Sequence, residues 1–212
     1  MDHAASDHAA TAPIGLGRIL TLPNLVTLVR LVCIPVFLWL LLGSDHTAIA
    51  AWLLAGLGAT DWIDGYLARH LHQGSELGKI LDPTADRLLL VAATVGIVAF
   101  GVSGIVSALA IVLLAREALV GAATVALALA GARRIDVLWV GKAGTLAVMF
   151  ALPMLLLAPE VTGGWHALLL TGGWGFGIPG TALGYYAAAK YVPAARAALA
   201  EGRQARLTKV VP

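Results

Sequence analysis

Four aspartates in two closely spaced pairs are the residues of this chain best suited to chemistry. They are Asp61, Asp64, Asp82 and Asp86. Residues three or four apart share one face of a helix, so this spacing predicts that the two carboxylates of each pair point the same way. Four converging anions repel one another, and oxygen-only donor sets suit hard divalent ions such as Mg²⁺ or Mn²⁺. The pattern therefore predicts a site for divalent cations.

The surroundings of these aspartates indicate a membrane. Of the 212 residues, 59% are apolar and only 12% are charged, and the mean hydropathy is +0.87. Soluble domains carry about 25% charged residues. An ionisable side chain in a membrane span costs at least ~2.5–3.5 kcal/mol, so four of them are expected to be functional. The simpler alternative, ordinary helix-end acids paired with Arg69, Lys79 and Arg87, accounts poorly for four at this spacing.

Six apolar runs predict an all-α integral membrane protein with six transmembrane helices. The runs cover residues 24–43, 47–68, 82–102, 104–131, 137–158 and 165–192. Each is close to the ~20 residues that cross a hydrocarbon layer of ~30 Å. In the third run, Asp82 is expected to be the N-cap and Pro83 the first helical residue. Small residues at helix-packing spacing predict close helix contacts for Gly56 with Thr60, Ala118 with Ala122, and Gly141 with Thr145.

The distribution of Lys and Arg predicts the orientation. Basic residues occur in the N-terminal tail, the 69–79 and 131–136 loops and the C-terminal tail, whereas the loops near 44–46, 101–104 and 159–164 have none. Because basic loops stay in the cytoplasm, both termini and the aspartates are expected there, in a multi-pass protein of the cell membrane. No nucleic-acid partner is expected.

Three parts are predicted along the chain. Residues 1–15 form a mobile tail, in which His3 and His8 are a weak signal for metal binding. Residues 16–195 form the membrane domain, and 196–212 form a basic tail. No cleavable signal peptide is recognised, so the first apolar run is expected to be an uncleaved anchor. The single cysteine, Cys33, excludes a disulfide within the chain.

The chemistry that fits four carboxylates is phosphoryl transfer. Two divalent ions ~3.5–4 Å apart stabilise both the attacking and the leaving oxygen, and a carboxylate not used by metal can accept a proton from a hydroxyl. Gly65 and Ala68 leave room beside the first pair, and Arg69 can bind phosphate oxygens. The alternative is a small divalent-cation or proton-coupled transporter. Transport sites usually lie near the midplane on broken helices, so the position of the aspartates at a helix end favours the enzyme.

The aspartate stretch resembles the signature of the CDP-alcohol phosphatidyltransferases, D-x2-D-G-x2-A-R-x8-G-x3-D-x3-D. Its eight fixed positions are filled by Asp61, Asp64, Gly65, Ala68, Arg69, Gly78, Asp82 and Asp86. The six-helix layout and the Leu22-Pro23-Asn24…Thr27…Arg30 start of the first helix are also similar to that family.

The resemblance implies that a CDP-linked lipid, usually CDP-diacylglycerol, donates its phosphatidyl group to an alcohol and releases CMP. It implies that Asp61, Asp64 and Asp82 hold two metal ions, and that Asp86 also approaches a metal and is the base for the acceptor hydroxyl. Gly65, Ala68, Arg69 and Gly78 would bind the CDP moiety. Members of the family are commonly homodimers.

Two acceptors stay open, glycerol 3-phosphate and phosphatidylglycerol. The candidate acceptor-binding cations are Arg116, Arg133, Arg134 and Lys142. Arg116-Glu117 resembles a pair in the branch of the family that makes phosphatidylglycerophosphate. That branch typically has a second basic residue shortly after Gly141-Lys142, which this chain lacks, and Arg87 stands where that branch often has Lys. Both differences weaken the glycerol 3-phosphate assignment and leave the phosphodiester acceptor open, so neither acceptor is preferred.

Overall fold

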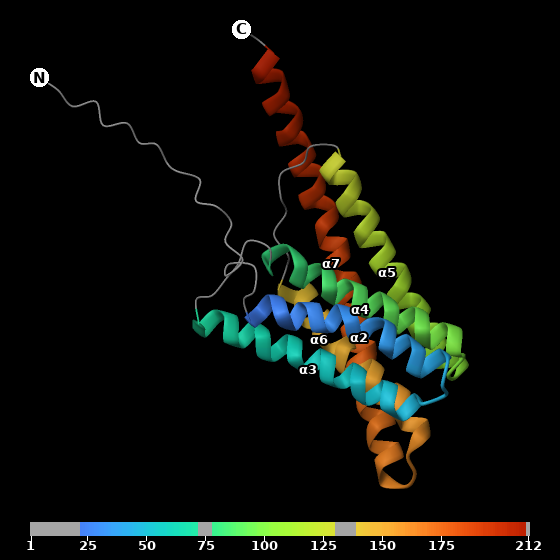
Figure 1. Ribbon diagram of the computed structural model, residues 1–212. Coiled ribbons are helices and arrows are strands. Elements are labelled where there is room, and N and C mark those ends of the chain that lie inside the picture. The colour runs from blue at the N-terminus through green and yellow to red at the C-terminus, as the bar shows by residue number, and fades with distance from the viewer. Residues whose placement is uncertain (1–21, 72–77, 130–138, 211–212) are drawn as a thin grey trace, which may run out of the picture.

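Six α-helices and one short 3₁₀ helix make up the described part of the chain (Figure 1). The computed structural model describes residues 22–71, 78–129 and 139–210, with side chains over 25–60, 84–127 and 139–193. The elements are α2 (Leu22–Leu42), α3 (Thr47–Leu71), α4 (Gly78–Phe100), α5 (Gly104–Leu129), α6 (Trp139–Leu157), η1 (Ala158–Glu160) and α7 (Gly164–Val210).

The six helices confirm the all-α class, and each corresponds to one of the predicted apolar runs. Three stretches within the described residues are long and apolar enough to cross a membrane: Leu25–Leu42, Gly104–Leu127 and Trp139–Glu160. The predicted tail at 1–15 and the segment that follows it, up to residue 21, lie outside the described residues.

The start of α4 differs from the prediction. Asp82 was expected to be the N-cap, but α4 begins at Gly78 and Asp82 is already helical. Proline is best tolerated near a helix start, and Pro83 is only the sixth residue of α4, so the helix loses one backbone hydrogen bond without breaking. The earlier start puts Asp82 and Asp86 on successive turns of one regular helix.

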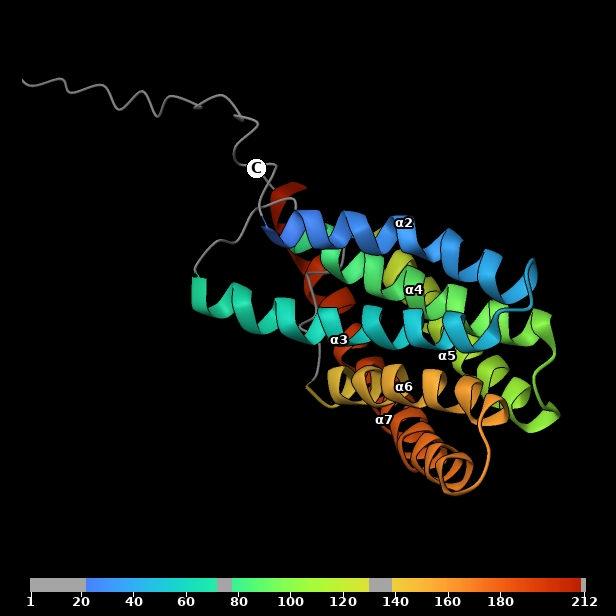
Figure 2. The ribbon, with the colours of Figure 1, turned by 60° about the horizontal axis from the view of Figure 1, so that its bottom comes forward.

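The helices form a bundle in which sequence neighbours are antiparallel. Helix α2 packs on α3 and α4, α4 packs on α5, and α3 packs on α6. In Figure 2, α2, α3, α4 and α6 run side by side. Short connections at 43–46 and 101–103 join antiparallel neighbours at one end of the bundle. Gly101 (φ 70°) and Gly163 (φ 66°) adopt the left-handed conformation that glycine reaches without strain.

The apolar core fills the part of the bundle nearest these short connections. Its largest fully buried side chains include Phe37 and Leu41 of α2, Ile97 of α4 and Leu156 of α6. The aspartate pairs lie toward the opposite ends of α3 and α4. The core therefore leaves one end of the bundle for the polar residues.

Helix α7 is far longer than a membrane span. Its 47 residues pack along α6 and, with fewer contacts, against α5, and the helix continues past Pro179 and Pro193 without interruption. At 1.5 Å per residue the helix is about 70 Å long, more than twice the thickness of the hydrocarbon layer. The predicted border at 195/196 thus lies inside a continuous helix.

Candidate active site

Helices α3 and α4 carry the four aspartates. The backbone is helical through Asp61 and Asp64 in α3 and through Asp82 and Asp86 in α4. Among these four, only Asp86 has a described side chain. The side chains of Asp61, Asp64 and Asp82, and positions Gly65, Ala68, Arg69 and Gly78, lie outside the described side chains. No cluster of three metal-binding side chains occurs within the described ones.

Charged residues from five helices lie at a similar depth in the bundle. This depth follows from the rise of ~1.5 Å per residue along each helix, counted from the helix end nearest the short connections. It is about 18 Å for Arg30 and Arg116, about 21 Å for Asp61 and Asp86, and about 22 Å for Lys142. In a hydrocarbon layer of ~30 Å these charges would lie inside the membrane, below its polar surface. We call this set of residues the charged level.

Arg30 and Asp86 form an ion pair between α2 and α4. Nη1 of Arg30 donates a hydrogen bond to Oδ1 of Asp86. The side chain of Arg30 is only 2% exposed, whereas that of Asp86 is 25% exposed. A buried guanidinium is tolerated only when its charge is compensated, and a planar guanidinium matches a carboxylate well. The pair therefore links α2 to α4, and the Asp86 side chain keeps some contact with solvent.

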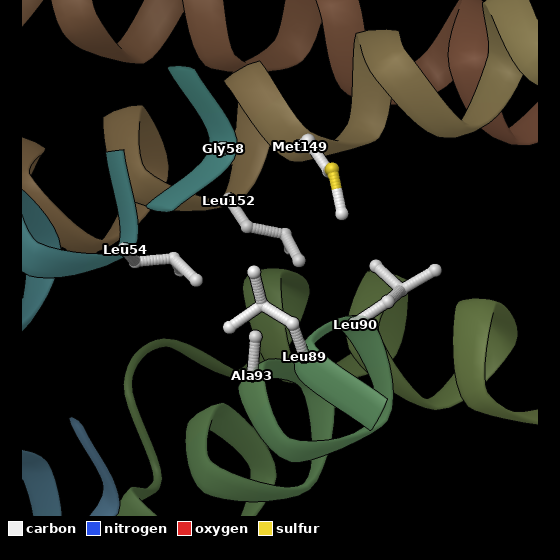
Figure 3. A pocket seen from close by; sticks show the side chains of 7 residues that line it. All are labelled: Leu54, Gly58, Leu89, Leu90, Ala93, Met149 and Leu152. Atoms are coloured by element: carbon white, nitrogen blue, oxygen red, sulfur yellow. The ribbon is translucent and has the colours of Figure 1, made fainter. Parts of the chain in front are cut away.

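An apolar layer lies directly beneath the charged level. Figure 3 shows Leu54 and Gly58 of α3, Leu89, Leu90 and Ala93 of α4, and Met149 and Leu152 of α6 around a small cavity. Its volume of about 10 Å³ is roughly the minimum needed to hold one water molecule, and its lining is apolar. Leu89 and Leu90 are one helical turn below Asp86. We call these seven residues the apolar floor, which closes the charged level on that side.

Arg116 lies at the contact between α5 and α7. Its Nη1 donates a hydrogen bond to Oε1 of the neighbouring Glu117, and the two side chains are 12% and 7% exposed. The Nε atom of Arg116 is buried and makes no hydrogen bond with the described residues. A Cβ added at Gly184 of α7 would lie 3.1 Å from this Nε, so the glycine provides the room that the guanidinium occupies. One turn away, the hydroxyl of Tyr185 donates to the carbonyl of Val112 at 2.9 Å.

The comparison with known proteins decides between the enzyme and the transporter. The model of the CDP-alcohol phosphatidyltransferase family matches residues 20–179. The chain belongs to the CDP-alcohol phosphatidyltransferase family.

Relatives of this phosphatidyltransferase carry two kinds of name. A Streptomyces coelicolor protein named cardiolipin synthase (CMP-forming) is 39% identical over 181 residues, 82% of each chain. A Mycobacterium tuberculosis (strain H37Rv) protein provisionally named a cardiolipin synthase is 40% identical over 164 residues, 77% of each chain. An Escherichia coli (strain K12) protein named CDP-diacylglycerol–glycerol-3-phosphate 3-phosphatidyltransferase is 37% identical over 143 residues, 66% of this chain and 79% of its own length. The family confirms a membrane-embedded transferase of phospholipid synthesis and excludes the transporter as the leading function.

Of the four candidate acceptor-binding residues, the structure describes the side chains of two. Arg116 is largely buried against α7, and Lys142 of α6 is exposed. Arg133 and Arg134 lie outside the described residues. Beside Lys142, Gly141 faces Ala187 of α7, where an added Cβ would lie 3.3 Å away. Arg116 thus lies against helix α7, and Lys142 follows a residue that does.

The predicted close helix contacts are correct only on α6. A Cβ at Gly144 would lie 2.8 Å from the carbonyl oxygen of Gly180, so α6 and α7 approach closely next to Gly141. Gly56 has nothing within 4 Å of its added Cβ, and Ala118 and Ala122 are exposed. Those two predictions were wrong within this chain, because small-residue spacing marks a possible contact and not which neighbour makes it.

Two residues of the site were missed by the sequence analysis as functional candidates, Arg30 and Gly184. Arg30 lies within the apolar stretch Leu25–Leu42, and a charge in such a stretch needs a partner. Applied to Arg30, that rule would have predicted the ion pair with one of the aspartates. Gly184 carried no comparable signal, because nothing in the sequence says that it faces Arg116.

Proposed function

We propose that this phosphatidyltransferase uses CDP-diacylglycerol as the donor and phosphatidylglycerol as the acceptor, forming cardiolipin and CMP. The observation that carries the proposal is the similarity to the CMP-forming cardiolipin synthase of Streptomyces coelicolor over 82% of both chains. The absence of a second basic residue directly after Lys142 supports the same acceptor. A phosphodiester carries one negative charge and needs fewer fixed cations than a free phosphate.

The donor set fits two divalent ions, Mg²⁺ or Mn²⁺. Asp61, Asp64 and Asp82 would hold them, with Asp86 close by, because all four are carboxylates carried on two regular helices. When bound, such ions neutralise the phosphate oxygens of the donor and stabilise the leaving group. Gly65, Ala68, Arg69 and Gly78 would bind the CDP moiety, with small residues admitting the nucleotide and Arg69 binding phosphate.

In the proposed reaction, Asp86 accepts the proton of the acceptor hydroxyl. The hydroxyl oxygen attacks the phosphorus that bears the diacylglycerol, a new P–O bond forms, and the P–O bond to the CMP phosphate breaks. CMP leaves with the bonding electrons, and Asp86 releases its proton to solvent. The partial exposure of Asp86 supports this role, because a base must reach both substrate and water. The apolar floor supports it too, since it keeps water from competing from below.

Glycerol 3-phosphate is the second candidate acceptor. Its support is the buried Arg116, whose Nε has no hydrogen-bond partner among the described residues, and the similarity to the Escherichia coli phosphatidyltransferase. In either case Arg116, Arg133, Arg134 and Lys142 are the proposed acceptor-binding residues. The two acceptors differ by a free phosphate, so one assay separates them.

We further propose six membrane spans, both termini in the cytoplasm of the cell, and a homodimer. The arrangement is supported by the basic-free connections at 43–46 and 101–103, which share one end of the bundle. The exposed side chains of Leu119 and Val125 on α5 are compatible with lipid or a second copy. Labelling of single cysteines introduced at 45 and 203, in a Cys33→Ala background, tests the orientation: only position 203 should react from the cytoplasmic side.

The acceptor assay is the decisive experiment. Purified protein in detergent is given CDP-diacylglycerol and Mg²⁺ or Mn²⁺, with phosphatidylglycerol or glycerol 3-phosphate in separate reactions, and both CMP and lipid products are identified. We expect CMP and cardiolipin with phosphatidylglycerol. Phosphatidylglycerophosphate with glycerol 3-phosphate, and nothing with phosphatidylglycerol, would contradict the proposed acceptor. No CMP from folded protein with either would contradict both.

A further inference from the structure

Exposed charged residues occur at two levels on the outer surface of the bundle. At the end with the short connections, Asp45 and Glu160 are exposed. About 20–22 Å further along the helices, Arg87 of α4 and Lys142 of α6 are exposed as well. Between these two levels, none of the described charged side chains is exposed. We call the surface between the two levels the apolar band.

Tryptophans lie near the same two levels. Trp39 and Trp52 are 62% and 67% exposed, and Trp139 is 78% exposed. Trp39 and Trp52 lie about 5 and 8 Å from the short connections, whereas Trp139 lies about 27 Å from them. Tryptophan is enriched at both interfaces between a membrane and water. Charged residues and tryptophans therefore agree on a band that is about 20 Å high.

The apolar band is shorter than an ordinary hydrocarbon layer of ~30 Å. Long basic side chains can reach toward the membrane surface, but this covers only part of the missing ~10 Å. Helix α2, whose exposed apolar side chains continue to Leu25, approaches the full thickness. Helix α5 has the longer apolar stretch Gly104–Leu127 and runs obliquely to α2, α3 and α4 (Figure 1), which is how a long helix fits a thin layer. The shortfall is therefore on the α4 and α6 sides.

We propose that the bilayer is locally thinned around α4 and α6, so that head groups of the cytoplasmic leaflet lie at the charged level. The partner of this surface is the phospholipid head-group layer, whose phosphates the exposed Arg87 and Lys142 bind. A lipid substrate then presents its phosphate at the depth of Asp86 without leaving the leaflet. This inference rests on the proposed six-span arrangement and on neither acceptor.

Energetics favours a change in the bilayer over a change in the protein. In an undistorted layer, Arg87 and Lys142 would be exposed to hydrocarbon, and a cation there is costly. Adjusting the bilayer thickness costs comparatively little for each ångström of mismatch. The two cations are fixed on regular helices, whereas the lipids around them are fluid. The lipids are therefore the part that adapts.

The depth of spin labels tests the thinning directly. Leu88→Cys and Val95→Cys, each in a Cys33→Ala background, place labels two turns apart on the exposed face of α4. In dioleoyl-phosphatidylcholine bilayers, the label at 88 is expected within about one helical turn, ~5 Å, of the polar surface. In a flat layer of ~30 Å it would lie about 12 Å below that surface. Ala143→Cys and Phe150→Cys are the equivalent pair on α6.

Accessibility to two relaxing agents reports these depths. The labels at 88 and 143 should be several-fold more accessible to the water-soluble chelate NiEDDA than those at 95 and 150, which should respond to O₂. A label at 88 that responds to O₂ and not to NiEDDA contradicts the thinning. A label at 88 that neither agent reaches is covered by a second copy of the chain and contradicts lipid as the partner.

Failure of the six-span arrangement has a different signature. NiEDDA that reaches the labels at 95 and 150 as readily as those at 88 and 143 would contradict the spanning itself. The depth measurements use no donor, acceptor or metal. A protein that shows the expected depths but transfers nothing to phosphatidylglycerol keeps the thinning and loses the proposed acceptor.

Melting in bilayers of different thickness gives an independent test. Dimyristoleoyl-, dioleoyl- and dierucoyl-phosphatidylcholine form increasingly thick bilayers, and the wild-type protein is expected to melt about 2–4 °C higher in the first than in the last. Arg87→Leu/Lys142→Leu lengthens the apolar band, so its highest melting temperature should move to a thicker bilayer. A double variant that keeps the wild-type preference would overturn the proposal.

Lys190→Leu is the matched control for the double variant. Lys190 is also an exposed cation, but it lies almost one turn past Ala187, which contacts Gly141, and so beyond the apolar band. Its replacement should leave the preferred bilayer unchanged. A shift as large as that of the double variant would mean that charge removal in general, and not the height of the band, sets the preference.

Discussion

The two charged regions of the bundle are built in different ways. Arg30 and Asp86 are 56 residues apart in the sequence, and their hydrogen bond joins α2 to α4. Arg116 pairs instead with the adjacent Glu117, and its place against α7 depends on the missing side chain of Gly184. One region is fixed by charge pairing between helices, and the other by how closely two backbones approach.

In the proposed reaction, this difference would separate chemistry from acceptor choice. Donor activation would depend on the helix positions that carry the aspartates, and a shift in their spacing would remove a carboxylate from the group. On the α5–α7 side a single side chain at a glycine position changes the room around a cation and leaves the aspartates untouched. Relatives named for different acceptors would therefore be expected to differ mainly on the α5–α7 side.

Removal of divalent metal should have the largest effect and should act on the aspartate region alone. With excess EDTA, CMP release is expected to fall to background, because the donor phosphates and the leaving group lose their counter-charge. Restoration by Mg²⁺ or Mn²⁺, but not by Ca²⁺ of equal charge and larger radius, would match the donor set. Undiminished CMP release in EDTA would remove the metal from the proposed reaction.

Asp86→Asn should be the most severe single substitution in which the folded structure is retained. Turnover is expected to fall about 10²–10⁴-fold, the usual contribution of a general base. The amide oxygen can still accept the hydrogen bond from Arg30 but no longer compensates its buried charge, so the melting temperature in detergent should fall, and turnover is compared per amount of folded protein. Wild-type-like CMP release from this variant would remove Asp86 from its proposed role.

Arg116→Gln should raise the KM for the acceptor and leave the KM for the donor nearly unchanged. Hydrogen bonds to charged groups contribute about 1.5–3 kcal/mol, so the KM for the acceptor is expected to rise roughly 10- to 100-fold. The KM for CDP-diacylglycerol should stay within a factor of two. An equal rise for both substrates would mean that the two regions are not separable.

Gly184→Ala should also raise the KM for the acceptor, but less than Arg116→Gln does. The new Cβ would lie 3.1 Å from Nε of Arg116, so the guanidinium must shift by a few tenths of an ångström. We expect a rise of about three- to tenfold in the acceptor KM, which corresponds to about 0.7–1.4 kcal/mol. Gly121→Ala, on the same helix as Arg116 but facing open space, is the control and should behave as wild type.

Much of the fold could be predicted from the sequence, because long apolar runs specify membrane helices without reference to their neighbours. The helix count and the family follow from residue types and spacing along one chain. The start of α4 was not predicted correctly. Pro83 was expected to mark the first helical residue, but a proline can also lie inside the first turns of a helix. The small-residue pairs Gly56–Thr60 and Ala118–Ala122 were misassigned for a related reason: spacing gives a face but not its partner.

The residues of the site also differ in how far the sequence alone predicts them. The spacing of the aspartates predicted which residues share a helix face, and their positions on α3 and α4 agree with it. The pairing of Arg30 with Asp86 and the space at Gly184 depend on which helices are neighbours. Which helices are neighbours is known only from the three-dimensional structure.

The apolar floor has a consequence for cellular energetics. About 20 Å of helix separates the charged level from the far end of the bundle, and the apolar floor lies within that distance. In the proposed six-span arrangement, the electrical potential across the membrane would fall mainly over this apolar layer, and the aspartates would be at the potential of the compartment they open to. Protons exchanged at Asp86 return to that compartment. Turnover in sealed vesicles should therefore be the same whether the membrane is polarised or not.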